Sequence, residues 1–214
     1  MKVALENVLP GEIEARSFEI ITEELGGRKL DEDKAPVIKR VIHTSADFEY
    51  ADTLCFSDGV IGKALEAIRG GASIVTDTQM GRSGINKRSL ARYGGQVYCF
   101  MGDEDVARQA RENGTTRAVA SIDKAASLEG PLIFAIGNAP TALVRLYELI
   151  KEGRIHPALV IGVPVGFVNV VQSKELIMET EAPYIVARGR KGGSNVAAAI
   201  CNALLYMIDE TRGQ

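Results

Sequence analysis

Apolar residues along this chain alternate between helical spacing and short continuous runs. Helical spacing predicts three amphipathic helices in the first third of the chain, at residues 12–25, 33–47 and 58–69. Short apolar runs then predict buried strands at 72–76, 96–101, 132–136, 158–163 and 184–188. Further helices are predicted between and after these strands, at 85–93, 104–113, 115–128, 140–150, 173–180 and 195–208. Strands separated by helices pair in parallel. We expect residues 1–214 to form a single domain. Its predicted fold is a three-layer α/β/α sandwich with a mainly parallel sheet of about five core strands.

The clearest strand–turn–helix unit begins at Leu132. The apolar run Leu132–Ile136 ends at Gly137-Asn138, and Pro140 fits the first turn of the helix that follows. Ligands of open parallel sheets bind beyond the carboxyl ends of such strands. An ordinary connecting loop gives the same local pattern, so the sequence leaves both interpretations open here.

His43 lies on the predicted helix 33–47, nearly opposite its apolar stripe. We therefore expect its side chain to face water, a cleft or a partner subunit. Imidazole exchanges a proton near neutral pH, so His43 is a candidate acid or base, although an exposed histidine without a catalytic role is the more common case. The other histidine, His156, precedes Pro157 in a predicted loop and is expected to be structural or merely exposed.

The glycine-rich stretch Gly189–Ser194 is the strongest general candidate for anion binding. Its glycines expose backbone N–H groups, Arg190 and Lys191 add positive charge, and a helix begins directly after it. The stretch matches neither the Walker A pattern nor the GxGxxG fingerprint. A glycine-rich turn with solvated basic residues is the alternative interpretation.

Other polar residues at predicted strand ends carry weaker signals. Asp77 is expected to be a helix cap or turn residue more often than a catalytic acid. Arg117 alone is more often a surface cation than an anion clamp. Ser83 lacks the surroundings of a nucleophile elbow.

Composition narrows the class of protein. The chain has 214 residues, a net charge of −3 and three widely separated cysteines. The slight negative charge argues against nucleic acid as a partner, and the cysteine spacing suggests a reducing cytosol and argues against a zinc site. Acidic residues near the start argue against a signal peptide, and no apolar run reaches the length of a membrane span. A cytoplasmic protein with no membrane contact is expected.

Five stretches, in the same order, resemble the precorrin-8X/cobalt-precorrin-8 methylmutase family of cobalamin biosynthesis. They are Ala15–Phe18, Val41–Thr44, Ile136–Leu143, Val165–Val168 with Gln172–Lys174, and Gly189–Ser194. The resemblance extends over essentially the whole chain. One departure is Gln172, where the family pattern has Glu before Ser-Lys.

The resemblance implies an isomerase that moves a methyl group from ring carbon eleven to ring carbon twelve of a corrinoid precursor. The reaction is a formal [1,5]-sigmatropic shift that gives hydrogenobyrinate or its cobalt form, cobyrinate. It implies no cofactor and no protein metal site, since any cobalt is carried by the substrate. His43 matches the family's histidine, which protonates the macrocycle or hydrogen-bonds to it.

The substrate carries many carboxylates, so clustered cations and helix N-termini are the candidate partners. The candidate substrate-binding residues are Arg16, Ser17, Thr78, Arg117, Gly137, Asn138, Ala139, Thr141, Arg190, Lys191 and Ser194. The resemblance also implies a homodimer with sites near the subunit interface. The last predicted helix, which is apolar on nearly every face, is expected to be buried or to lie in that interface.

Two other functions remain open from the sequence. One is a corrinoid-binding carrier without catalysis, and the other is a nucleotide-using oxidoreductase on a Rossmann-like sheet. The residues around Thr44–Asp47 and Asp77–Met80 favour a cobalt-loaded substrate over a metal-free one.

Overall fold

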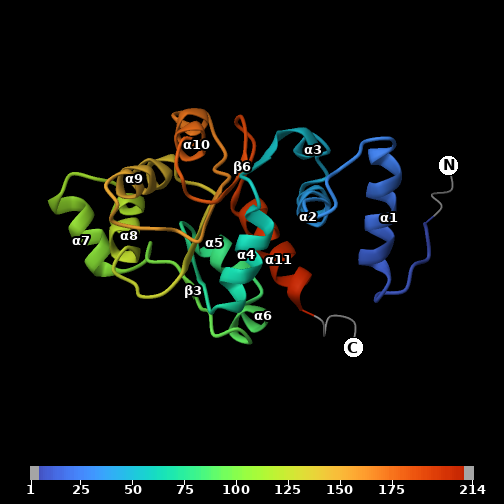
Figure 1. Cartoon of the computed structure of the whole chain (residues 1–214), viewed down its shortest axis with the longest axis horizontal. Helices are drawn as coiled ribbons and strands as arrows, with labels where there is room; N and C mark the ends of the chain where they lie inside the picture. Colours follow the sequence, from blue (N-terminus) through green and yellow to red (C-terminus); the bar gives the residue numbers. More distant parts are fainter. Residues whose placement is uncertain (1–4, 210–214) are drawn as a thin grey trace.

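Helices cover both faces of one β-sheet in the computed structural model, which describes residues 5–209 (Figure 1). The helices are α1 (Ile13–Leu25), α2 (Ala35–Ser45), α3 (Tyr50–Thr53), α4 (Val60–Arg69), α5 (Gln79–Gly84), α6 (Lys87–Ala91), α7 (Glu104–Glu112), α8 (Arg117–Ala125), α9 (Pro140–Lys151), α10 (Val170–Met178) and α11 (Ser194–Ile208). The strands are β1 (Leu54–Phe56), β2 (Ser73–Thr76), β3 (Val97–Tyr98), β4 (Leu132–Ile136), β5 (Leu159–Gly162) and β6 (Tyr184–Ala187).

The sheet is mainly parallel, as the sequence predicts. Within residues 5–209 it has six strands in the order β1-β6-β5-β4-β2-β3. The strands β2 to β6 pair in parallel, and β1 adds to β6 in the antiparallel direction. The prediction of about five strands missed β1, because three residues are too few to display a recognisable pattern.

The two faces of the sheet bury different side chains of each strand, because successive residues point to opposite sides. In β4, Ile133 and Ala135 pack in the core on one face, and Leu132, Phe134 and Ile136 pack in the core on the other. Residues of α2, α4 and α11 complete the first core, and residues of α8, α9 and α10 complete the second. The chain therefore folds as the three-layer α/β/α sandwich that the pattern predicts.

The helix α11 is buried by the chain itself. It packs against α2, α4, α5 and the strand β4, and its buried side chains include Val196, Ile200 and Leu204. Its all-round apolar surface is therefore explained within one chain and gives no argument for a dimer. No helix among the described residues is both long enough and apolar enough to cross a bilayer.

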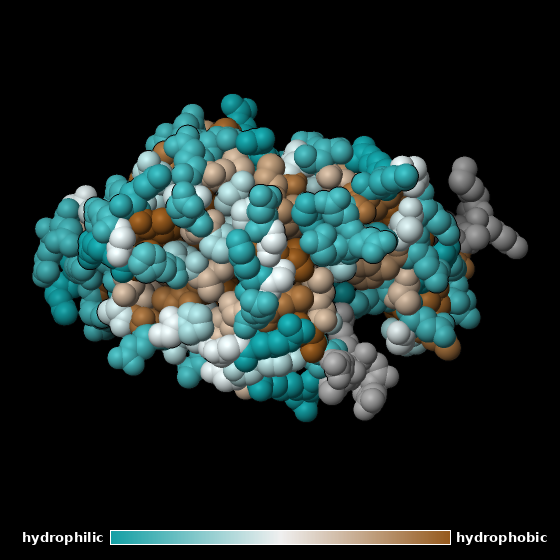
Figure 2. Space-filling model, viewed as in Figure 1, coloured by the Kyte–Doolittle hydropathy of each residue, from teal (hydrophilic) through white to brown (hydrophobic). Residues whose placement is uncertain are grey.

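The molecule is elongated, with α1 beside α2 at one end and α7 beside α8 at the other (Figure 1). In α7 the buried side chains are Val106 and Ala110, and the space-filling view shows a mostly hydrophilic surface at that end (Figure 2). More apolar surface is exposed near the middle of this face.

The segment after β2 differs from the prediction. The sequence predicts no helix between the strand at 72–76 and the helix at 85–93, but Gln79–Gly84 form the short helix α5. The hydroxyl of Thr78 accepts a hydrogen bond from the Gly81 N–H at 2.9 Å, so Thr78 caps this helix. The helix predicted at 85–93 is correspondingly shorter, at Lys87–Ala91.

Candidate functional site

The candidate residues gather around the carboxyl edge of the sheet. The loops after β2, β4, β5 and β6 all leave the sheet there, because these strands are parallel. Leu54 at the start of antiparallel β1 pairs with Ala187 at the end of β6, so the segment between α2 and β1 reaches the same edge. The topology thus brings the end of α2, which carries His43, to the loops that carry the glycine-rich stretch.

Asp77 lies in the loop after β2 and binds the backbone of the loop between β4 and α9, so it braces a turn and does not cap a helix. Its carboxylate accepts hydrogen bonds from the N–H groups of Gly137, Asn138 and Ala139 at 2.9, 2.8 and 2.6 Å. The residue is only 3% exposed, and burial raises the pKa of Asp77, while the three amide bonds oppose that rise. These three amides, expected to bind a substrate carboxylate, already hold a carboxylate of the protein.

Two further contacts join this loop to the start of α11. The hydroxyls of Thr78 and Ser194 are hydrogen-bonded at 2.7 Å. A Cβ on Gly137 would lie 2.6 Å from the Ser194 Cα, so a side chain at 137 would push the two loops apart. The segments after β2, after β4 and before α11 therefore form one closely packed unit.

Arg117 and Thr141 lie at neighbouring helix N-termini. Thr116 caps α8 by accepting a hydrogen bond from the Val119 N–H at 3.2 Å, and its hydroxyl contacts the Thr141 hydroxyl at 3.1 Å. Arg117 is the first residue of α8 and is exposed. The structure thus places one exposed cation beside the N-terminus of α9.

Lys174 supports the backbone of the glycine-rich stretch, although no role was assigned to this lysine from the sequence. Lys174 is fully buried and donates hydrogen bonds to the Gly189 and Lys191 carbonyls at 2.8 and 2.9 Å. Burial lowers the pKa of Lys174 to about 8. The sequence contains one signal for this role: Lys174 follows Ser173 and lies between Val170 and Ile177, on the face of the helix that is buried.

The buried lysine predicts a distinctive pH dependence of stability. Between pH 8 and the ordinary lysine pKa of about 10.4, the unfolded chain binds more protons at Lys174 than the folded chain does, so folding becomes more favourable as pH rises. We expect the advantage of the parent over Lys174→Met in unfolding free energy to grow by about 2 kcal/mol from pH 7.5 to 9.5. Urea unfolding of both proteins measures this difference, and a constant difference would contradict it.

Gly192 keeps the same stretch close to the loop after β5. It has φ of +159°, and a Cβ there would lie 2.1 Å from the Val163 carbonyl oxygen. Only glycine fits this backbone without displacing one of the two loops.

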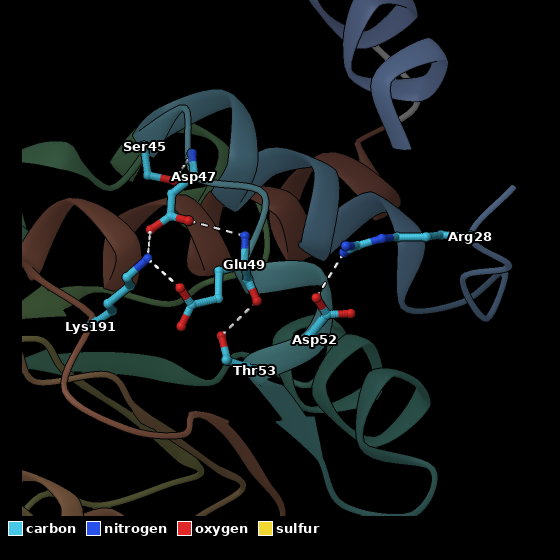
Figure 3. Close-up of polar contacts among 7 residues, drawn as sticks. All are labelled: Arg28, Ser45, Asp47, Glu49, Asp52, Thr53 and Lys191. Atoms are coloured by element: carbon cyan, nitrogen blue, oxygen red, sulfur yellow. Dashed lines mark hydrogen bonds and ion pairs between the residues drawn. The ribbon is translucent and has the colours of Figure 1, made fainter. Parts of the chain in front are cut away.

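Lys191 is engaged in ion pairs with residues that follow α2 (Figure 3). Its ammonium lies 2.6 Å from the Asp47 carboxylate and 2.7 Å from that of Glu49. These contacts lower the pKa of Asp47 and raise that of Lys191. This ion pair cannot be predicted from the sequence, because Asp47 and Lys191 lie 144 positions apart.

Arg190 has different surroundings. Its guanidinium carbon lies 5.4 Å from the ring centroid of Phe167, which is 80% exposed on the loop after β5. The contact is a cation–π interaction at the molecular surface. An exposed cation and an exposed aromatic ring therefore stand together at the carboxyl edge.

His43 lies in the last turn of α2 with its side chain exposed, as its position opposite the apolar stripe predicts. It lines an open hollow of about 430 Å³ together with Ser17, Glu24 and Phe48. Its ring stacks on Phe18 of α1, with the centroids 5.5 Å apart.

Two residues singled out from the sequence have other surroundings. Arg16, on α1, lies at 2.7, 3.2 and 4.0 Å from three carboxylates of its own segment, those of Glu6, Glu19 and Glu23. His156 is exposed and lines hollows near Pro157, before β5, at the amino edge of the sheet.

Fold and site together define a class: a mainly parallel α/β/α sandwich with a glycine-rich loop and exposed arginines at the carboxyl edge of its sheet, and with a histidine at an open hollow on the helix that leads to this edge. A protein-family model described as precorrin-8X methylmutase matches residues 12–207. The chain belongs to this family, and it is a methylmutase, an isomerase of cobalamin biosynthesis.

Relatives and solved structures agree with this assignment. The chain is 46% identical to the cobalt-precorrin-8 methylmutase of Priestia megaterium over 94% of this chain and 90% of the relative. It is also 46% identical to that of Salmonella typhimurium, over 94% and 97% of the two chains. A crystal structure of precorrin-8X methylmutase from Thermus thermophilus superimposes with a TM-score of 0.84 at 39% identity, covering 92% of this chain and 96% of the other.

Proposed function

We propose that this chain converts cobalt-precorrin-8 to cobyrinate by moving a methyl group from ring carbon eleven to ring carbon twelve. Membership of the methylmutase family across residues 12–207 carries the reaction class. The cobalt form is favoured because the relatives that are 46% identical bear the name cobalt-precorrin-8 methylmutase.

The proposed chemistry requires little of the protein besides binding and proton placement. The bond between the methyl group and ring carbon eleven breaks, the bond to ring carbon twelve forms, and the conjugated double bonds shift. Atoms and electrons balance without an oxidant or a methyl donor. We assign His43 the role of donating to the macrocycle a hydrogen bond, or a proton that the imidazole takes back after the shift, which withdraws electron density from the conjugated system and eases the migration.

Several parts of the carboxyl edge support binding of a polycarboxylate macrocycle. Arg190 and Arg117 are exposed cations at the ends of this edge, and the exposed ring of Phe167 offers an apolar surface beside Arg190. Charge-assisted hydrogen bonds from such cations fix carboxylates in register. In this proposal any cobalt belongs to the substrate, and the protein supplies no cofactor of its own.

Product analysis tests the proposed function directly. The purified chain is incubated separately with cobalt-loaded and metal-free substrate, and the position of the methyl group is determined by NMR or mass spectrometry of the product. We expect the methyl-shifted product in both reactions, with a higher kcat/KM for the cobalt form. Tight binding of substrate without a methyl-shifted product would instead identify a carrier, and a higher kcat/KM for the metal-free form would overturn the substrate assignment.

Arg190→Ala should weaken corrinoid binding by about 1–3 kcal/mol, the range for losing a charge-assisted hydrogen bond. Titration of cobyrinate, followed by absorbance, measures the change. The matched control is Arg154→Ala, which removes an exposed arginine that precedes β5 at the opposite edge of the sheet. Equal affinities of the two variants would show that Arg190 is a solvated surface residue.

Lys191 offers a second comparison in the same titration. If its ammonium meets a substrate carboxylate, Asp47 and Glu49 compete with the substrate for it. Lys191→Ala should then weaken binding, and the double variant Asp47→Asn/Glu49→Gln should tighten it.

A cytoplasmic homodimer is the assembly we propose, on the strength of the family resemblance. Light scattering at micromolar concentration should then report twice the monomer mass of 23.0 kDa. A monomer that retains full turnover would exclude a dimeric site.

A further inference from the structure

The imidazole of His43 stacks on an aromatic ring that belongs to a different helix. Phe18 of α1 presents its ring to His43 of α2 with the centroids 5.5 Å apart and the planes inclined by 13°. Nearly parallel rings at this separation form an offset stack. An exposed imidazole otherwise moves among several rotamers, so a stack selects the one that keeps the ring against Phe18.

Phe18 is itself held in place by contacts with the rest of the protein. The guanidinium carbon of Arg40 lies 4.7 Å from the Phe18 ring centroid and 5.2 Å from that of Tyr206 on α11. Arg40 is only 13% exposed and pairs with Glu14 of α1 at 2.7 Å. Because the Phe18 ring is anchored through Arg40 to both α2 and α11, it is a fixed surface on which the imidazole can rest.

The stacked His43 ring also lines the hollow of about 430 Å³. Ser17, Glu24 and Phe48 line this hollow with His43, but the ring of Phe18 contacts the imidazole itself. One turn later, Asp47 fixes the chain to Lys191 at 2.6 Å. The backbone after His43 is therefore anchored by an ion pair, and its side chain is oriented by an aromatic contact.

We infer that Phe18 is a positioning residue for the methyl shift: its ring holds the His43 imidazole in the orientation from which it reaches the macrocycle. The inference rests on the proposed role of His43. Phe18 itself transfers no proton and is not a catalytic residue. Its loss should therefore affect the rate of the chemical step and leave corrinoid affinity nearly unchanged.

The test uses Phe18→Leu, which keeps an apolar side chain but removes the aromatic face. We expect the single-turnover rate to fall about tenfold, with a product dissociation constant within twofold of the parent. Phe18→Tyr, which keeps the ring, should recover most of the rate. Phe56→Leu is the matched control, because Phe56 also lies under a cation, Lys34 at 5.9 Å, but belongs to β1 and does not contact His43.

NMR gives a readout of the stack that does not depend on activity. The chain has two histidines, so the His43 ring signals are assigned by comparison with His156→Asn. Stacking on Phe18 shifts the His43 ring protons upfield, and Phe18→Leu should abolish that shift while Phe18→Tyr keeps it. Unchanged His43 signals in Phe18→Leu, or a parental single-turnover rate in that variant, would overturn the inference.

The same experiments separate this inference from the proposed function. Suppose that His43→Ala keeps the parental rate and that the parent protein shows the ring-current shift. The stack then exists, but the proposed role of His43 fails, and with it the effect of Phe18 on the rate. If His43→Ala is slow and Phe18→Leu is fast, the role of His43 stands and the positioning role of Phe18 fails. In a His43→Ala background, Phe18→Leu should lower the rate no further, and an additional tenfold loss there would contradict positioning through His43.

Discussion

His43→Ala should lower the single-turnover rate of the methyl shift by roughly a hundredfold or more, the scale expected for losing a positioned acid or base. The variant should fold normally, because the side chain is exposed and lies opposite the buried residues of α2. It should also keep appreciable corrinoid affinity, since the cations at the carboxyl edge remain. Spectroscopic single-turnover conversion separates the chemical step from slow product release.

Two companion variants make this prediction sharp. His156→Ala removes the other histidine, an exposed residue at the opposite edge, and should turn over like the parent. His43→Asn should recover little of the rate if a proton is transferred, and more if a neutral hydrogen bond suffices. Near-parental rates in both His43 variants would mean that His43 takes no part in the chemistry.

Asp77→Ala should destabilise the fold by about 3–5 kcal/mol, because it leaves three N–H groups of the loop between β4 and α9, that of buried Gly137 among them, without their acceptor. That loss is a large share of the 5–15 kcal/mol that is typical of a domain's stability. Asp77→Asn keeps one side-chain acceptor and should cost roughly half as much. Urea unfolding followed by circular dichroism measures all three proteins.

The control for Asp77 is a carboxylate of the same kind in an exposed position. Asp58, which follows β1, is exposed, and Asp58→Asn should change stability by no more than about 0.5 kcal/mol. If Asp77→Ala lowered the free energy of unfolding no more than Asp58→Asn does, the prediction would be wrong. Such a result would mean that water replaces the carboxylate at the three amides.

The predictable part of the fold follows from periodicity. The apolar runs of β2, β4, β5 and β6 and the apolar faces of α1, α2 and α9 are long enough to be recognised in the sequence. The strand β1 could not be found, because its three residues become a strand only by pairing with β6, more than a hundred positions away. The short helix α5 was missed because its existence depends on the cap at Thr78.

The site, like the fold, has one part that the sequence predicts and one part that only the tertiary structure shows. The exposure of His43 follows from its place on a helix, and a role in bracing a turn is a common one for an aspartate after a strand. Which partners these residues have is a property of the tertiary structure. Only the fold brings Asp77 to the amides of the loop before α9, Lys191 to Asp47, and Phe18 to His43.

The sheet order has a consequence for how the chain is made on the ribosome. The helix α2 packs most extensively against α11, and β1 pairs with β6, so the segment that carries His43 has its main packing partners at the far end of the sequence. Domains generally acquire their structure as units during synthesis, and contacts between distant segments form late. The buried faces of α2 and β1 therefore stay exposed to solvent until β6 and α11 have been translated. Polypeptides released before that point lack the partner of β1 and the helix that covers α2, and we expect them to be aggregation-prone and to be degraded.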